Sequence, residues 1–112
     1  MPGTDRVVRD GQVAVLVSTS HGAGWSTWND DRYDPEVMMF DPQLVDIVLA
    51  GGQDWIDKVR ALARIKYTDA YLGGLEIGLQ VQWVPQGCLF RVVEYDGAER
   101  IELRDRMEWI QA

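Results

Sequence analysis

The side chains that could do chemistry gather in one polar loop, residues 18–31, directly after a short apolar run, Val13–Val17. The loop holds His21, the only histidine of the chain, and histidine is the residue type that most readily exchanges a proton near neutral pH. With a loop serine as nucleophile, His21 could act as a general base in a small hydrolase. A loop histidine that hydrogen-bonds to backbone is the simpler interpretation, and no recognised catalytic motif is present. We therefore expect that the chain is not an enzyme.

Two glycines and two tryptophans stand close together in the same loop, at Gly22, Gly24, Trp25 and Trp28. Backbone N–H groups of a glycine loop can hold phosphates and a tryptophan can stack on a base, so nucleotide binding is one hypothesis. The segment has neither the Gly-Lys-Ser/Thr of a Walker A loop nor the full G-x-G-x-x-G spacing. The tryptophans are three residues apart and on a helical turn would share a face, either packed in the core or exposed for binding.

The charge balance favours a basic protein partner over nucleic acid. The chain has 11 lysines and arginines and 18 aspartates and glutamates, which gives a net charge of −7. Contacts with phosphates need a basic patch, so we expect no direct nucleic-acid binding. An acidic surface instead suits a partner protein that itself holds nucleic acid. The same acidity also keeps a protein soluble, whatever it binds.

Length and composition indicate a single domain, residues 1–112, which we expect in the cytoplasm. No apolar run approaches the ~20 residues that span a bilayer, and residues 1–12 are too charged for a signal peptide. We expect residues 1–12 to form a loose extension, with a brief edge strand at Val7-Val8 as the alternative. The single cysteine, Cys88, excludes an internal disulfide and offers no metal-ligand spacing. We therefore expect no cofactor, no metal and no membrane contact.

Two helices, over residues 42–50 and 54–66, are among the elements that must position the loop. Asp41 can cap the first helix, and Pro42 fits its first turn. In both segments apolar residues recur at three- and four-residue spacing, which predicts one buried face for each helix. The acidic residues of 30–36 lack the pattern of an EF-hand loop, and we interpret them as a solvated turn.

Strands are expected near residues 13–17, 75–84, 88–95 and 99–104. The first is apolar at nearly every position, which is typical of an interior strand covered on both faces. The second alternates strictly between apolar and polar residues, which predicts one face on the core and one in water. The fold predicted is α+β, with a small antiparallel sheet of about four strands covered by two helices. The apolar tail after residue 105 is expected to fold back over this sheet.

The last two strands can be paired residue by residue. The Asp96-Gly97 dipeptide is a strong signal for a two-residue hairpin turn. The resulting register places apolar pairs on one face, but it also sets Glu94 opposite Glu99 on that face, where like charges destabilise. Three explanations are open: fraying at the tip, a longer bulged turn, or a site where two carboxylates meet a cation, a hydroxyl or a basic partner.

Three motifs resemble those of a family of small proteins encoded by phages and prophages. They are GAGWSTWN (22–29), YLGGLEI (71–77) and EYDGAERIEL (94–103), followed by a tryptophan near the C-terminus. The resemblance covers nearly the whole chain from Val13 to Ile110. It brings no catalytic residues, but it implies a context, because small acidic phage proteins often inhibit a host enzyme or immune complex.

We expect the loop and the hairpin turn to meet at one end of the sheet and to form a binding surface. The leading hypothesis is an anti-CRISPR-like inhibitor that occupies a basic surface of a bacterial defence complex in the host cell, and nucleotide binding is the alternative. The expected binding residues are His21, Gly22, Gly24, Trp25, Ser26, Trp28, Asn29, Glu94, Tyr95, Asp96 and Glu99.

Overall fold

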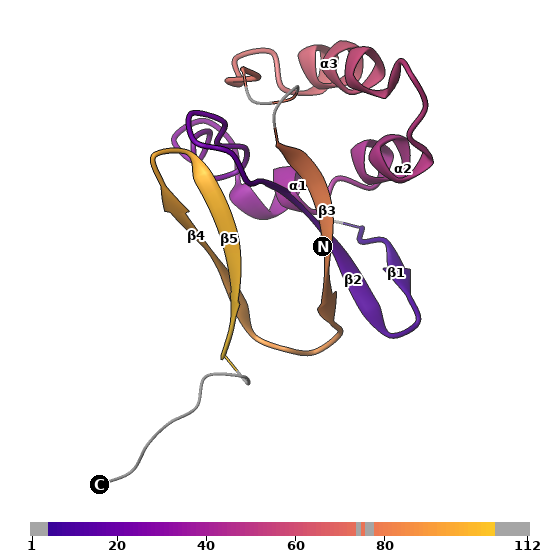
Figure 1. Cartoon of the computed structure of the whole chain (residues 1–112), viewed down its shortest axis with the longest axis vertical. Coiled ribbons are helices and arrows are strands. Elements are labelled where there is room, and N and C mark those ends of the chain that lie inside the picture. The colour runs from indigo at the N-terminus through magenta and orange to yellow at the C-terminus, as the bar shows by residue number, and fades with distance from the viewer. Residues whose placement is uncertain (1–4, 74, 76–77, 105–112) are drawn as a thin grey trace, which may run out of the picture.

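The computed structural model describes residues 5–73, 75 and 78–104, and the fold is α+β as expected (Figure 1). The strands form two antiparallel sheets, one with the order β1-β2-β3 and one made of β4 and β5, so the prediction of a single sheet is corrected. The expected fold-back of the tail after residue 105 lies outside the described residues. The elements in chain order are β1 (Val8–Arg9), β2 (Gln12–Ser18), α1 (Pro35–Met39), α2 (Pro42–Ala50), α3 (Trp55–Lys66), β3 (Leu79–Pro85), β4 (Phe90–Tyr95) and β5 (Ala98–Leu103).

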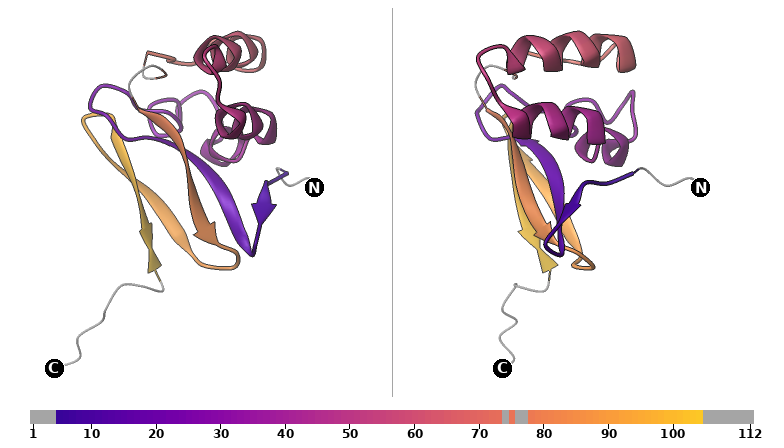
Figure 2. Two further views of the ribbon diagram at one scale, coloured as in Figure 1. Left: turned by 45° about the vertical axis from the view of Figure 1, so that its right-hand side comes forward. Right: turned by 90° about the vertical axis from the view of Figure 1, so that its right-hand side faces the viewer.

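β2 is covered on both faces, as its apolar sequence predicts. Ala14 and Leu16 belong to a buried cluster with residues of α2 and α3. Val13, Val15 and Val17 belong to a second cluster, against which the β4–β5 hairpin packs. β2 and β3 therefore lie between the helices and the hairpin (Figure 2). The end of β2 delivers the polar loop to the boundary between these layers.

β3 begins later than predicted. Its pairing with β2 starts at Leu79, which lies opposite Ser18, the last residue of β2. Leu75 is buried but lies in a turn before the strand. Val81 and Trp83 pack with Leu79 against the helix-side cluster, so the predicted alternation holds over this part of the strand.

Residues 8–12 form part of a hairpin where a loose extension was expected. Asp10 and Gly11 have φ angles of 52° and 75°, which are typical of a type I′ turn. Val8 pairs with Val13 across this turn. The alternative of a short edge strand is therefore the one observed, at residues 8–9, while residues 1–4 lie outside the described part.

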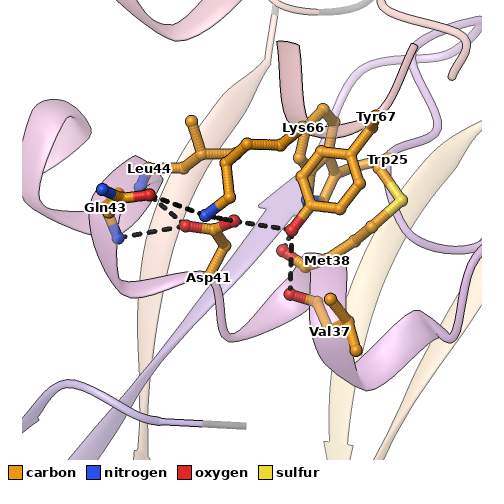
Figure 3. A network of polar contacts seen from close by, with 8 residues as sticks. All are labelled: Trp25, Val37, Met38, Asp41, Gln43, Leu44, Lys66 and Tyr67. Carbon is orange, nitrogen blue, oxygen red and sulfur yellow. Dashed lines mark hydrogen bonds and ion pairs between the residues drawn. The ribbon is translucent and has the colours of Figure 1, made fainter. Parts of the chain in front are cut away.

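Asp41 is a buried carboxylate that caps α2 and joins it to the end of α3 (Figure 3). Its Oδ1 accepts hydrogen bonds from the N–H groups of Gln43 and Leu44 at 3.0 and 3.1 Å, as the capping signal predicts. Its Oδ2 accepts one from the Tyr67 hydroxyl at 2.6 Å and lies 2.7 Å from Lys66 Nζ. Burial and the bond to Asp41 raise the pKa of Tyr67.

A third helix, α1, replaces part of the predicted solvated turn at residues 30–36. Asp34 Oδ1 accepts a hydrogen bond from the N–H of Glu36 at 2.9 Å, and Pro35 occupies the first turn. This Asp-Pro pair is the same signal that begins α2. Within the described residues no helix is long and apolar enough to cross a membrane.

The β4–β5 hairpin has the predicted register at all of its pairs. Glu94 lies opposite Glu99, and Asp96 and Gly97 have φ angles of 50° and 85°, as a type I′ turn requires. Fraying at the tip and a longer bulged turn therefore do not explain the pairing of the two glutamates. Their surroundings do.

Candidate functional site

The polar loop after β2 lies against the turn between β4 and β5 (Figure 1). The N–H of Gly22 donates to the Asp96 carbonyl oxygen at 2.5 Å. A Cβ added to Gly97 would lie 2.7 Å from the backbone nitrogen of Ala23, so only glycine fits at this close approach. The loop and the hairpin turn thus meet, as the sequence led us to expect.

The carboxylate of Glu99 holds the loop from inside the protein. Its Oε1 accepts a hydrogen bond from the N–H of Ser18 at 2.9 Å. Its Oε2 accepts three more, from the N–H of Trp25 at 2.9 Å and from the N–H and hydroxyl of Thr27 at 3.0 and 2.5 Å. Glu99 is 2% exposed, and a buried carboxylate is tolerated when such charge-assisted bonds replace water.

Glu94 holds the same loop from its exposed side. Its Oε2 accepts hydrogen bonds from the N–H of Gly97 at 2.7 Å and from the indole N–H of Trp28 at 3.1 Å. These two bonds lower the pKa of Glu94. The two glutamates can face each other across the hairpin because each carboxylate binds its own donors, Glu99 inside and Glu94 outside. The sequence left open a site where both carboxylates meet a hydroxyl; only Glu99 binds one, from Thr27, whereas Glu94 binds N–H groups.

Exposed aromatic rings gather around the hairpin tip. Trp28, Tyr71 and Tyr95 are 36%, 41% and 78% exposed. The Trp28 and Tyr71 ring centroids are 5.2 Å apart, and those of His21 and Tyr95 are 5.9 Å apart. The Tyr71 hydroxyl donates to the Gly22 carbonyl oxygen at 2.8 Å, which links the two ring pairs. We call the surface made of His21, Trp28, Tyr71, Glu94, Tyr95 and Asp96 the tip face.

The negative charge of the tip face has little compensation. Residues 18–31 and 92–99 contain no lysine or arginine. Glu94 is bound by two uncharged N–H donors. Asp96 Oδ2 lies 3.9 Å from Nδ1 of His21, and both side chains are exposed. The tip face therefore presents carboxylates to solvent beside its rings.

Five of the expected binding residues are buried and shape the loop. Trp25 donates its indole N–H to the Met38 carbonyl oxygen at 3.0 Å. The Asn29 side chain bonds to the backbone of Trp25 and of Tyr71. A Cβ on Gly24 would lie 2.2 Å from Cγ of Trp28. The expectation of an exposed binding role is corrected for these residues, because they are buried in this conformation. They are Gly24, Trp25, Ser26, Asn29 and Glu99.

The geometry offers little to the hydrolase hypothesis. The hydroxyls of Ser18 and Ser26 are buried and have no partner among the described residues, whereas the His21 side chain is 65% exposed. Across the same residues, no three side chains of the metal-ligating types converge.

The nucleotide hypothesis needs free N–H groups in the loop, and four of these groups are already bound within the protein. The N–H groups of Ser18, Trp25 and Thr27 are bound by Glu99, and that of Gly22 by the Asp96 carbonyl oxygen. A phosphate at this position would have to displace a buried carboxylate of like charge. Three of these N–H groups of the loop thus bind Glu99 of β5 where those of a phosphate-binding loop would bind a phosphate.

Tyr71 was not among the expected residues but contributes to the site, as does Thr27, which the motif resemblance alone had marked. Tyr71 packs on Trp28, and the Thr27 hydroxyl binds Glu99. Both stand inside the motifs on which the family resemblance depends, at the first position of YLGGLEI and within GAGWSTWN. The position of Tyr71 and Thr27 inside these motifs is the feature of the sequence that points to them.

Comparison with known proteins adds no relative from which a site could be transferred. No protein-family model matches the chain, and neither a curated protein nor a solved structure matches it. The function of the tip face is therefore argued from its own contacts and charge.

Proposed function

We propose that the chain is an acidic binding protein that occupies a basic surface of a partner protein. The tip face carries this proposal, because the rings of Trp28, Tyr71 and Tyr95 stand exposed beside the carboxylates of Glu94 and Asp96. Tryptophan and tyrosine are the side chains most enriched among the residues that dominate binding energy at protein interfaces. Carboxylates around them steer the approach of a basic partner and reject acidic ones.

The tip face is held in shape before any partner arrives. Glu99 fixes the loop from within, and Glu94 fixes the indole of Trp28. Tyr71 is tied to Gly22 through its hydroxyl. Side chains that are already ordered lose less conformational entropy on binding, which favours affinity.

Occupation of a basic surface inhibits the partner when that surface normally holds nucleic acid. The net charge of −7 supports such competition. The resemblance to phage and prophage proteins supplies the setting, a host bacterial cytoplasm in which the partner is a defence complex. The proposed activity is therefore anti-CRISPR-like inhibition, in which an acidic protein takes the place of nucleic acid.

A pull-down from bacterial lysate with tagged protein tests this function. The variants are Tyr95→Ala and, as a matched control, Ile65→Ala, since Ile65 on α3 is 76% exposed and lies outside the tip face. We expect the wild type and the control to retain a basic protein at low salt and to release it at high salt, because screening weakens exposed charge pairs. The Tyr95→Ala variant is expected to retain no such basic protein, even at low salt.

The captured protein is then tested for nucleic-acid binding with and without the purified chain. The proposal predicts that the chain blocks that binding. Capture that does not depend on Tyr95 would contradict the proposal. A released nucleotide with no protein partner would contradict it in favour of the nucleotide hypothesis.

A further inference from the structure

Tyr95 and its two neighbours form the part of the tip face that selects one kind of side chain. Tyr95, the last residue of β4, is 78% exposed, and its ring meets that of His21 at 81°. Glu94 before it and Asp96 after it are both exposed. Glu94 lines the same surface hollow as Tyr95, and Asp96 lies beside His21, the residue that the Tyr95 ring meets. An exposed ring with carboxylates nearby suits a cation, since ring quadrupole and carboxylate charge attract it together.

Each of these carboxylates keeps an oxygen atom for such a cation. Glu94 uses only Oε2 for its bonds with Trp28 and Gly97, and within the described residues Oε1 has no hydrogen-bond partner. Asp96 Oδ2 is 3.9 Å from Nδ1 of His21, beyond hydrogen-bond distance. The partner can therefore be bound without breaking a contact of the free protein.

The surface beside Tyr95 is hollowed and can take a long side chain. Thr19, Gln82 and Ala98 supply uncharged groups to the lining, along with Tyr95 itself. Arg100 also lines the hollow. Its Nη1 lies 2.7 Å from Oε2 of Glu102, which also pairs with Arg91, so the carboxylate offsets only part of the charge of Arg100. Glu94 and Glu99 are the other charged residues of the lining.

We infer that the tip face binds an arginine side chain of the partner, with the guanidinium against the Tyr95 ring and its N–H groups donating to the carboxylates of Glu94 and Asp96. The inference rests on the proposed function and names the partner group that the site recognises. Arginine fits better than lysine because a planar guanidinium can lie on a ring and donate hydrogen bonds within its own plane. An ammonium group is more strongly hydrated and cannot do both.

Two blocked peptides of equal charge serve as probes, one with four arginines alternating with glycine and one with four lysines. Each is titrated into ¹⁵N-labelled protein at fixed salt, and the indole N–H of Trp28 and the amides of residues 94–98 are followed. We expect the arginine peptide to bind about threefold more tightly or better, with the largest shifts at these groups. Tyr95→Ala is expected to abolish the preference, and Tyr95→Phe to keep it because the ring remains.

Two further variants, each of which removes one charge near the hollow, test whether the hollow attracts cations. Asp96→Asn removes a charge without disturbing the hairpin, because Asn-Gly suits a type I′ turn. It is expected to weaken both peptides. Arg100→Gln is expected to strengthen both, since it removes a like charge beside the hollow. Weaker binding of both peptides to Arg100→Gln would show that the hollow does not attract a cation through its charge, and would overturn the inference.

The outcomes separate this inference from the proposed function. Equal affinity of the two peptides at the tip face, or no peptide binding there at all, overturns the arginine inference, while Tyr95-dependent capture of a basic protein from lysate still stands on its own. The arginine inference and the proposed function are both overturned if the peptides shift only signals of other surfaces and Tyr95→Ala captures the same protein from lysate as the wild type.

Discussion

Oε2 of Glu99 binds both donors of Thr27, the backbone N–H at 3.0 Å and the hydroxyl at 2.5 Å. The two residues are 72 positions apart in the chain, on β5 and in the loop after β2. A glutamate that looks misplaced in its hairpin is therefore the group that gives the loop its shape. The exposed rings of the tip face depend on this buried contact.

Glu99→Ala is expected to lower the free energy of unfolding by about 3 kcal/mol or more, because four donors lose their acceptor at once. Urea unfolding measures the change. Glu36→Ala is the control, since its ion pair with Arg6 is exposed and such pairs contribute less than about 1 kcal/mol. Similar losses for the two variants would contradict the anchoring role of Glu99.

Gly24→Ala is expected to destabilise the protein by about 1–3 kcal/mol, because the new methyl group would overlap Cγ of Trp28. The same substitution in a Trp28→Ala background should cost much less, since the overlapping ring is gone. Thermal or urea unfolding of the four proteins gives the coupling between the two positions. Equal costs in both backgrounds would show that the close packing of Gly24 and Trp28 is not the cause.

The Trp28 indole N–H is expected to report the titration of Glu94. Bonds from Gly97 and Trp28 lower the pKa of this carboxyl below its ordinary value of 4.5. The folded state thus holds the proton less tightly than the unfolded state, so the stability from this group is present above pH 4.5 and is lost as the pH falls through the lowered pKa. An NMR titration of the indole N–H should have its midpoint below 4.5, and Glu94→Gln should abolish it. A midpoint at or above 4.5 would contradict these contacts.

Asp41→Ala is expected to destabilise the protein by about 3–5 kcal/mol, because it removes the cap of α2 and leaves Lys66 without its carboxylate in a partly buried site. Tyr67→Phe removes only one hydrogen bond and should cost about 1 kcal/mol. Urea unfolding of the two variants measures the difference. A larger loss for Tyr67→Phe would mean that the hydroxyl, rather than the carboxylate, holds the helices together.

Local signals explain how much of the fold could be predicted from the sequence. Asp41 and Pro42 begin α2 where expected, and the turn at Asp96-Gly97 fixes the hairpin register, because each signal acts over a few neighbouring residues. The same Asp-Pro signal begins α1, but it stands within an acidic stretch that is typical of a solvated turn. The division into two sheets depends on how the hairpin packs on one face of β2, which is a long-range property.

The meeting of the loop and the hairpin turn was predicted from the sequence, but which of their residues are buried and which are exposed was not. Trp25 and Trp28 are three residues apart, yet Trp25 is 2% exposed beneath Met38 and Trp28 is 36% exposed beside Glu94. The two tryptophans would share a face only on a helical turn, and this loop is irregular, so they point to different sides. The inward direction of Glu99 could not be predicted either, since its donors come from a segment far away in the chain.

The most direct test of the central claim is photocrosslinking from the tip face in living bacteria. A photoreactive phenylalanine analogue replaces Tyr95 in one protein and Ile65 in a second, two positions of nearly equal exposure. We predict that position 95, and not position 65, crosslinks to a basic protein, and that Asp96→Asn weakens the crosslink. Crosslinking from position 65 alone, or from both positions equally, would contradict a partner-binding role of the tip face.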